Sequence, residues 1–322
     1  MKKEQLKREI RQMCKDKNAV ILAHYYTDGE VQDIADFVGD SLALAQSAAK
    51  TEADIIVMCG VGFMGETCKI LCPDKKVIVP DEDAGCSLAD SCKAEDLKAF
   101  IDEHPGYKVV SYVNTTAAVK ALSDVVVTSS NAMKVVETYP KDAKLIFGPD
   151  RNLGSYINRM TGREMLLWDG GCHVHGRFSL EGINQLKKEH PEAKVLVHPE
   201  CPVEIQKVAD EIGSTAGLLK FAINDEAQEF IVATESGILH KMQEACKDKT
   251  FYPAPPMCGE GEKCPLENVC QYMRMNTLEK LHAALRDEKP EVFVSASLAE
   301  NALRPIQKML RTPSPLPLKG QK

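Results

Sequence analysis

The stretch Val20-Ile-Leu-Ala-His24 recurs in altered form as Val109-Val-Ser-Tyr112 and Val195-Leu-Val-His198. In each copy a short β-branched run ends in a histidine or a tyrosine, and these end points lie 88 and 86 residues apart. A hydroxyl residue follows 17 positions after each end point, as Ser41, Ser129 and Thr215. The sequence therefore predicts a threefold internal repeat.

Each copy continues with two further strand-like runs, separated by helix-like stretches. The second run reads Ile55-Ile-Val-Met58, Leu145-Ile-Phe147 and Phe230-Ile-Val232, and the third leads into Cys86, Cys172 and Cys258. Strands that alternate with helices indicate βαβ units and parallel sheets. A period of about 86 residues exceeds that of solenoid repeats. We therefore expect an α/β fold of three homologous αβα (Rossmann-like) domains, in a pseudo-threefold arrangement around a central active site.

The repeat also predicts where the domains begin and end. The first covers residues 1–86 and is completed by the C-terminal segment 271–311, the second covers 87–172 and the third 173–270. Apolar residues at helical spacing near the N-terminus predict an amphipathic helix packed on the first domain. Residues 312–322 hold three prolines and a glycine with little apolar content, which predicts a disordered tail.

Composition narrows the class of protein. Of the 322 residues, 44% are hydrophobic and 27% charged, which excludes disordered, collagen-like and small disulfide-scaffold proteins. A net charge of -7 speaks against a nucleic-acid partner. The N-terminus lacks the layout of a secretory signal, and no run approaches the roughly 20 apolar residues of a membrane span. We expect a cytoplasmic protein, in which twelve cysteines are buried thiols, metal ligands or redox residues.

The repeated cysteines indicate a metal centre. In open α/β sheets, ligands bind beyond the carboxyl ends of the strands, so three converging domains would bring the repeated cysteines to one cavity. A single buried cysteine is usually a small hydrophobe, but three at matching positions favour thiolate ligation of zinc or of an iron–sulfur cluster. Three thiolates on a four-iron cluster would leave one iron open to act as a Lewis acid. Spacing alone does not choose between the two metals.

Polar side chains at the strand ends suit proton transfer and anion binding. His24 and Tyr26, like His198 and Glu200, are two residues apart and so would point to the same side of an extended strand. Imidazole, phenol and carboxylate groups together serve proton transfers near neutral pH. The hydroxyl residues open helix-like segments, where capping is their simplest role, and helix N-termini also bind anions. These residues are Ser41, Ser129, Ser214 and Thr215.

One glycine motif favours a different ligand. Gly60-Val-Gly62-Phe-Met-Gly65 matches the dinucleotide-binding fingerprint. It follows the second strand-like run instead of the first, however, and the other two copies lack it. A tight turn explains the glycines equally well.

Taken in order, several motifs resemble quinolinate synthase, from about residue 18 to residue 311. They are Ala23-His24-Tyr25-Tyr26, Gly39-Asp40-Ser41-Leu42, Cys86-Ser-Leu-Ala-Asp90, Tyr112-Val-Asn114, Gly148-Pro-Asp150, Gly171-Cys172-His-Val-His175, His198-Pro-Glu200-Cys201 and Gly213-Ser214-Thr215. The resemblance implies condensation of iminoaspartate with dihydroxyacetone phosphate to quinolinate, with loss of phosphate and water, in NAD biosynthesis. It also implies a [4Fe-4S] cluster with one open iron, and a functional link to an aspartate oxidase or dehydrogenase that supplies iminoaspartate.

The resemblance assigns residues to these roles. It implies Cys86, Cys172 and Cys270 as cluster ligands, because Cys270-Gln-Tyr-Met273 resembles the segment around the family's last ligand. Repeat spacing selects Cys258 instead, and we favour Cys270, with Cys258 and Cys264 in an inserted loop. The resemblance gives the proton transfers to Tyr26, His198 and Glu200. It gives substrate binding to His24, Ser41, Tyr112, Asn114, Ser129, His175, Ser214 and Thr215.

Two other functions fit parts of the pattern. An electron-transfer or redox-sensing protein could hold a cluster, but it would need a fourth protein ligand and would not need three sets of polar strand ends. A zinc hydrolase could use His173, His175 and His198 as ligands.

Overall fold

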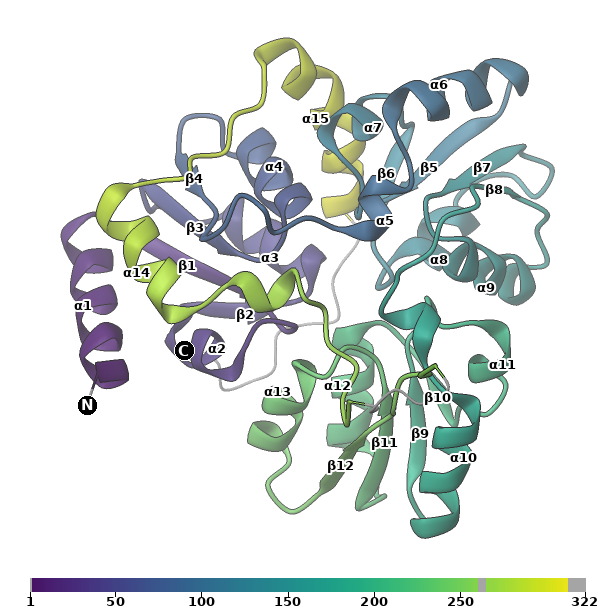
Figure 1. The fold of residues 1–322 in the computed structure, drawn as a ribbon. Coiled ribbons are helices and arrows are strands. Elements are labelled where there is room, and N and C mark those ends of the chain that lie inside the picture. Colours follow the sequence, from purple (N-terminus) through teal and green to yellow (C-terminus); the bar gives the residue numbers. More distant parts are fainter. Residues whose placement is uncertain (1, 260–264, 312–322) are drawn as a thin grey trace.

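The computed structural model describes residues 2–259 and 265–311. It contains three four-stranded parallel sheets. Figure 1 shows these sheets, each with its helices, as three lobes around a common centre. The α/β prediction with three repeated domains is therefore confirmed. The predicted tail at 312–322 and Cys264 lie outside the described residues.

The three sheets share one strand order. In the first, β2 (Phe37–Gly39), β1 (Ala19–His24), β3 (Ile55–Cys59) and β4 (Lys76–Ile78) lie side by side in that order. The second repeats it as β6 (Val125–Val127), β5 (Lys108–Tyr112), β7 (Leu145–Gly148) and β8 (Leu166–Leu167). The third repeats it as β10 (Glu211–Ile212), β9 (Lys194–Val197), β11 (Glu229–Ala233) and β12 (Thr250–Pro253).

Helices cover both faces of the sheets, so the strands are buried on both sides and consist mostly of apolar residues. Every residue of β3 and β7 is buried, as expected for parallel strands packed on both faces. The helices of the first two lobes are α1 (Lys2–Asp16), α2 (Gly29–Ile34), α3 (Ser41–Ala48), α4 (Gly62–Leu71), α5 (Ser87–Asp90), α6 (Ala94–Glu103), α7 (Ala117–Ala121), α8 (Ala132–Glu137) and α9 (Arg151–Thr161). Those that follow are η1 (His175–Arg177), α10 (Leu180–Glu189), α11 (Val203–Gln206), α12 (Thr215–Asn224), α13 (Ile238–Ala245), η2 (Met273–Met275), α14 (Leu278–Asp287) and α15 (Ala296–Leu310).

The two ends of the described chain pack on the first lobe, and the C-terminal helix also packs on the second lobe. The predicted N-terminal helix is α1, which contacts α14 and β1 and buries Ile10 completely. Helix α15 lies against α3 and α4 of the first lobe, and also against α7 and β6 of the second. Its Ala302, Ile306 and Met309 are fully buried in the apolar core that these two lobes share. The domain boundaries given above stay a prediction.

The glycine motif after β3 has a packing role. Gly62 is the first residue of α4, and a Cβ on Gly65 would lie 2.8 Å from Val79 Cγ1. A side chain at Gly65 would therefore push α4 away from the segment after β4. Close packing requires this glycine, so no bound dinucleotide is needed to explain it.

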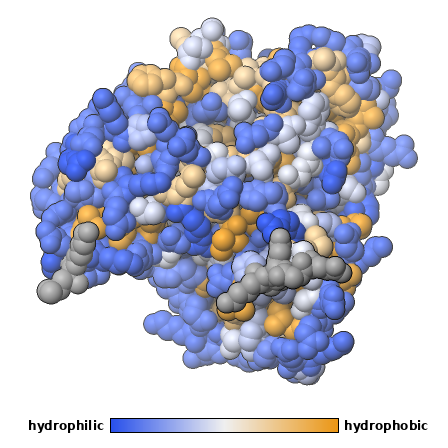
Figure 2. Space-filling view, viewed as in Figure 1, coloured by the Kyte–Doolittle hydropathy of each residue, from blue (hydrophilic) through white to orange (hydrophobic). Residues whose placement is uncertain are grey.

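A membrane span requires a long apolar helix, and an interface with a large apolar partner requires a broad apolar patch on the surface. Across the described residues, every helix is too short or too polar to cross a bilayer. The face shown in Figure 2 is mostly hydrophilic, and its apolar side chains form small groups. Isolated apolar residues of this kind are normal on globular proteins.

Candidate functional site

One cavity at the meeting point of the three lobes collects the predicted site residues. Its wall includes the ends of β1, β5 and β9 and the segments after β4, β8 and β12. All the predicted site residues except Ser214 line it. They are His24, Tyr26, Ser41, Cys86, Tyr112, Asn114, Ser129, Cys172, His175, His198, Glu200, Thr215 and Cys270. Ser214 lines a neighbouring groove that shares Ser129 with the cavity.

The three cavity cysteines share one local structure. Each is followed by a short helical turn, α5 after Cys86, η1 after Cys172 and η2 after Cys270. In every case the thiol accepts backbone N–H groups from the residues two and three positions later. Burial raises the pKa of all three thiols, and these N–H groups act against that rise because they stabilise the thiolate. Cys258 does not line the cavity.

The spacing of the sulfur atoms discriminates between metals. Ligands of one tetrahedral zinc, at bonds of about 2.3 Å, lie about 3.8 Å from one another. The sulfurs of Cys86, Cys172 and Cys270 do not all lie within 4.8 Å of one another. A single zinc ion held by all three thiols therefore does not fit this arrangement.

The histidine set expected for a zinc hydrolase does not converge. Among the described residues, the only close group of three or more candidate ligand atoms is Cys172, His175 and Glu200. His173 Nδ1 is instead hydrogen-bonded to Ser87 Oγ at 2.6 Å. The structure therefore does not bring His173, His175 and His198 together as the ligands of a zinc hydrolase.

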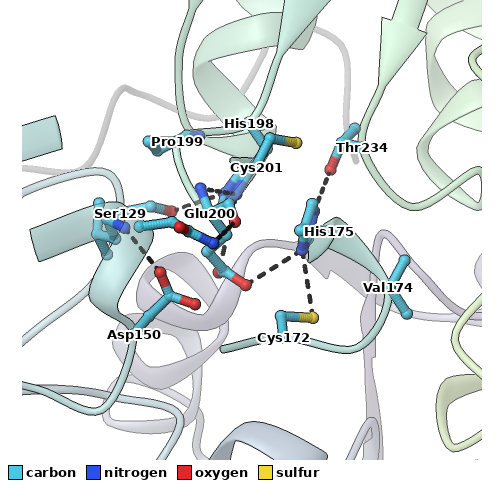
Figure 3. Close-up of polar contacts among 12 residues, drawn as sticks. Ser129, Asp150, Cys172, Val174, His175, His198, Pro199, Glu200, Cys201 and Thr234 are labelled. Carbon is cyan, nitrogen blue, oxygen red and sulfur yellow. Dashed lines mark hydrogen bonds and ion pairs between the residues drawn. The ribbon is translucent and has the colours of Figure 1, made fainter. Parts of the chain in front are cut away.

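Glu200 lies at the centre of the polar network in the cavity. The Tyr112 hydroxyl donates to Glu200 Oε1 at 2.5 Å. His175 Nδ1 lies 3.1 Å from Glu200 Oε2 (Figure 3). Burial on its own would raise the pKa of this carboxyl. The contact with His175 and the hydrogen bond from the Tyr112 hydroxyl outweigh burial and hold the pKa below its usual range. Glu200 is therefore ionised at neutral pH and can accept a proton.

Two imidazoles stack beside this carboxylate. The rings of His175 and His198 lie 4.5 Å apart at 28°, and His175 Nε2 contacts Thr234 Oγ1 at 2.9 Å. His198 Nε2 lies 3.3 Å from Ser129 Oγ. Burial, helped by His175, lowers the pKa of His198 to about 3. His198 is therefore a neutral imidazole that can donate or accept a hydrogen bond at neutral pH.

Tyr26 joins the first lobe to the third. Its hydroxyl is hydrogen-bonded to Thr215 Oγ1 at 2.6 Å and to Thr234 Oγ1 at 2.8 Å. Burial raises the pKa of this phenol well above its usual value. The neighbouring His24 is also buried, which lowers its pKa to about 3. Both groups are therefore neutral hydrogen-bonding partners.

The hydroxyl residues differ in their use as helix caps. Ser214 caps α12 as expected, with Gly217 N–H donating to its Oγ at 3.1 Å. Helix α3 is instead capped by Asp40, which accepts from Ala43 N–H at 2.9 Å, and Ser41 is its first residue. Capping was therefore the wrong expectation for Ser41, and also for Ser129, which lies three residues before α8. The stronger carboxylate acceptor takes the cap of α3 and leaves the Ser41 hydroxyl to the cavity.

Sequence reasoning missed two site residues in the third lobe. Thr234 bonds both Tyr26 and His175, and Glu235 lines the cavity with a side chain that is 1% exposed. Both directly follow β11, the second long strand of that repeat. Polar residues directly after β11 could have been predicted as site residues from the sequence, because the carboxyl end of β11 faces the cavity as that of β9 does.

The cavity wall carries no fixed cation. None of the described residues that line it is a lysine or an arginine. Its polar groups are hydroxyls, imidazoles, an amide and carboxyls. Two cations contact lining residues from behind: Lys120 Nζ lies 5.2 Å from the centroid of the Phe63 ring, and Arg274 Nη2 lies 3.1 Å from Glu235 Oε1.

Comparison with known proteins agrees with this geometry. The profile of the quinolinate synthetase A protein family matches residues 8–311. The chain is 54% identical to quinolinate synthase of Nostoc punctiforme over 301 residues, which is 94% of this chain and 91% of that protein. It is 52% identical to quinolinate synthase of Microcystis aeruginosa over the same length, covering 94% and 93%. The chain belongs to the quinolinate synthase family.

Proposed function

We propose that this protein condenses iminoaspartate with dihydroxyacetone phosphate to form quinolinate, with loss of phosphate and water. The observation that carries the proposal is the convergence of three cysteines, one from each lobe, on a cavity of proton-transfer groups. An enzyme or pathway step that oxidises aspartate would supply the iminoaspartate. The product would feed NAD biosynthesis, as the family name implies.

The donor set fits a [4Fe-4S] cluster held by Cys86, Cys172 and Cys270. Thiolates are the ligands of such clusters, the three thiols line one cavity, and each thiol faces two backbone N–H groups. Hydrogen bonds to cluster sulfurs stabilise the negative charge of the assembly. With only three protein ligands, the bound cluster would supply one open iron as a Lewis acid.

In this proposal Glu200 is the general base. Its carboxylate is ionised, faces the cavity and is oriented by Tyr112 and His175. His198 and Tyr26 are neutral and can relay protons as the substrates enolise, condense and lose water. His198 lies beside Glu200, with 3.7 Å between Nδ1 and Oε1, and its Nδ1 accepts the Glu200 backbone N–H at 3.3 Å. Its Nε2, 3.3 Å from Ser129 Oγ, is the nitrogen left to exchange a proton in the cavity.

Neutral donors would bind the carboxylates and the phosphate. Ser41, Asn114, Ser129 and Thr215 offer hydroxyl and amide groups toward the cavity. His24, Tyr112 and His175 add ring N–H and phenol donors. Ser214 would act through the N-terminus of α12, which its side chain caps.

The first test is the metal content of protein purified without oxygen. We expect about four irons and four acid-labile sulfides per chain, together with turnover of iminoaspartate and dihydroxyacetone phosphate. Stoichiometric zinc without sulfide, or an intact cluster without any quinolinate formed, would refute the proposed function.

The choice of the third ligand is tested by a matched pair of substitutions. Cys270→Ser is expected to abolish the four-iron cluster, because it removes one of the three thiols that line the cavity. Cys258→Ser is the control and is expected to keep the wild-type iron and sulfide content. The reverse result would restore the assignment that repeat spacing gives.

The role of Glu200 is tested by Glu200→Gln. The amide keeps the size of the side chain but cannot accept the proton, so turnover should fall by at least about 100-fold. Iron and sulfide content should stay at the wild-type level. Near wild-type turnover would show that another group is the base.

A further inference from the structure

Lys120 is a fully buried cation behind the cavity wall. It belongs to α7, its side chain has 0% exposure, and it is among the largest fully buried side chains of the described residues. Lysine is rarely buried completely because the ammonium loses its hydration. Such a residue needs an explanation that a surface lysine does not.

Its immediate surroundings only partly satisfy the ammonium. The Nζ atom donates to the carbonyl of Thr115, and it lies 5.2 Å from the centroid of the Phe63 ring. An ammonium carries three donors, and one carbonyl and one ring face do not replace its hydration. Longer-range charges must therefore supply part of its stabilisation.

The negative groups that favour the ammonium are Glu66 and, once it is a thiolate in a bound cluster, the proposed ligand Cys86. Burial lowers the pKa of Lys120 to about 7, and Glu66 and Cys86 act in the opposite direction. Phe63, which contacts the ammonium, also lines the cavity, as does Asn114 next to Thr115. Lys120 is therefore separated from the cavity by a single layer of side chains.

The charges inside the cavity call for such a cation. In the proposed function the cavity holds three thiolates and substrates with carboxylate and phosphate groups. It also contains the Glu200 carboxylate, and its described wall has no lysine or arginine. A buried cation acts over several ångströms because the surrounding protein screens it less than water does.

We infer that Lys120 offsets the negative charge of the cluster bound by Cys86, Cys172 and Cys270 and so sets its electron affinity. This inference rests on the proposed function. The reduction potential of an iron–sulfur cluster depends on net charge and burial around it. Removal of Lys120 should therefore lower the potential, and removal of a nearby negative charge should raise it.

Glu66 provides the substitution of opposite sign. It lies on α4, one turn after Phe63, and its carboxylate accepts the backbone N–H of Ala117 at 2.8 Å. A glutamine in its place keeps an oxygen to accept this bond while it removes the charge. A loosened fold or added water near the cluster would shift the reduction potential of both variants in the same direction. A charge effect shifts the two reduction potentials in opposite directions.

The experiment is a redox titration, followed by electron paramagnetic resonance, of wild type, Lys120→Met, Glu66→Gln and Arg163→Met. Arg163 is the control, because it is a buried cation whose guanidinium binds the carbonyls of Tyr139 and Pro140, away from the cavity. At a fixed potential, the ratio of reduced to oxidised cluster should fall about tenfold in Lys120→Met, which is about 59 mV. It should rise in Glu66→Gln and stay unchanged in Arg163→Met.

The outcomes separate the inference from the function beneath it. Potentials equal to wild type in Lys120→Met and Glu66→Gln, or shifts of the same sign in both, would overturn the inference and leave Lys120 as an anchor for the Thr115 loop. If Lys120→Met does not fold, an unchanged potential in Glu66→Gln alone overturns it. Wild-type protein without iron and sulfide would refute the proposed function and this inference together.

Discussion

Arg274 links the first and third lobes beside a proposed cluster ligand, and its removal should destabilise the fold. Its Nη1 lies 2.5 Å from Asp28 Oδ1 and its Nη2 lies 3.1 Å from Glu235 Oε1. Glu235 Oε1 also accepts the Cys270 N–H at 3.1 Å, and Glu235 Oε2 accepts the Gly237 N–H at 2.7 Å. The pair therefore fixes the backbone of Cys270.

The expected magnitude follows from burial. Loss of one partner from a buried ion pair costs about 3–5 kcal/mol. Glu235 is 1% exposed, but it keeps two backbone donors, and because burial raises its pKa to about 7 it can take up a proton when Arg274 is lost. Arg274→Met should therefore cost about 3 kcal/mol in the free energy of unfolding, the low end of that range. In the double variant with Glu235→Gln no buried charge is left unpaired, and we expect about 1–2 kcal/mol of that loss to be recovered.

The assay is urea unfolding of cluster-free, reduced protein for wild type, both single variants and the double variant. The surface pair of Arg286 and Asp287 provides the control, because both side chains are at least half exposed. Arg286→Met should change the free energy of unfolding by less than about 0.5 kcal/mol. A coupling energy between Arg274 and Glu235 below about 0.5 kcal/mol would refute the reasoning.

Two further predictions concern an ion pair and a cap. The Lys17 and Lys76 ammonium groups hold the pKa of Glu288 at about 2, so Glu288→Gln should cost about 1 kcal/mol at pH 7. Because folding lowers the pKa of Glu288, the stability lost in Glu288→Gln should disappear as the pH falls from about 4.5 to about 2. Urea titrations of wild type and variant at pH 7 and pH 3 test this prediction. An equal loss of stability at both pH values would contradict it. Ser214→Ala removes the acceptor for Gly217 N–H and should cost about 1 kcal/mol of stability. Its KM should change by less than about threefold, since Ser214 does not line the cavity, and a larger rise in KM would show that the hydroxyl reaches the substrate.

The sequence predicted three strands in each repeat and missed the short strand that follows the first one along the chain. The runs that form β1, β5 and β9 are β-branched, bounded and repeated, so they were recognisable without a structure. The strands β2, β6 and β10 have two or three residues each and pair at the sheet edge beside the first strand. Segments this short carry no measurable periodicity. Their existence follows from tertiary pairing, which a local pattern does not encode.

Repeat spacing selects a third cysteine, Cys258, that does not line the cavity. The counting placed Cys258 after β12 at the distance that Cys86 and Cys172 have in their copies. In the structure Cys270 lines the cavity, because the chain between the last strand and the ligand turn is longer in the third lobe. The local signal that survives an insertion is the helical turn directly after the cysteine, with its two N–H groups. In the sequence, the resemblance of Cys270-Gln-Tyr-Met273 to the segment around the family's last ligand selects Cys270 where spacing does not.

The placement of charge around the cavity has a chemical rationale within the proposed reaction. A lysine or arginine in the wall would bind anionic substrates and the transition state alike, and such uniform binding does not raise the turnover rate. The structure instead offers neutral donors to the cavity and keeps Lys120 and Arg274 one layer behind it. From there each cation acts on a fixed group of the protein. Lys120 acts on Cys86, and Arg274 acts on the Glu235 carboxylate, which accepts the Cys270 N–H. The two cations thus stabilise the ligand shell, while the hydroxyls and imidazoles remain free to follow charge as it moves during the reaction.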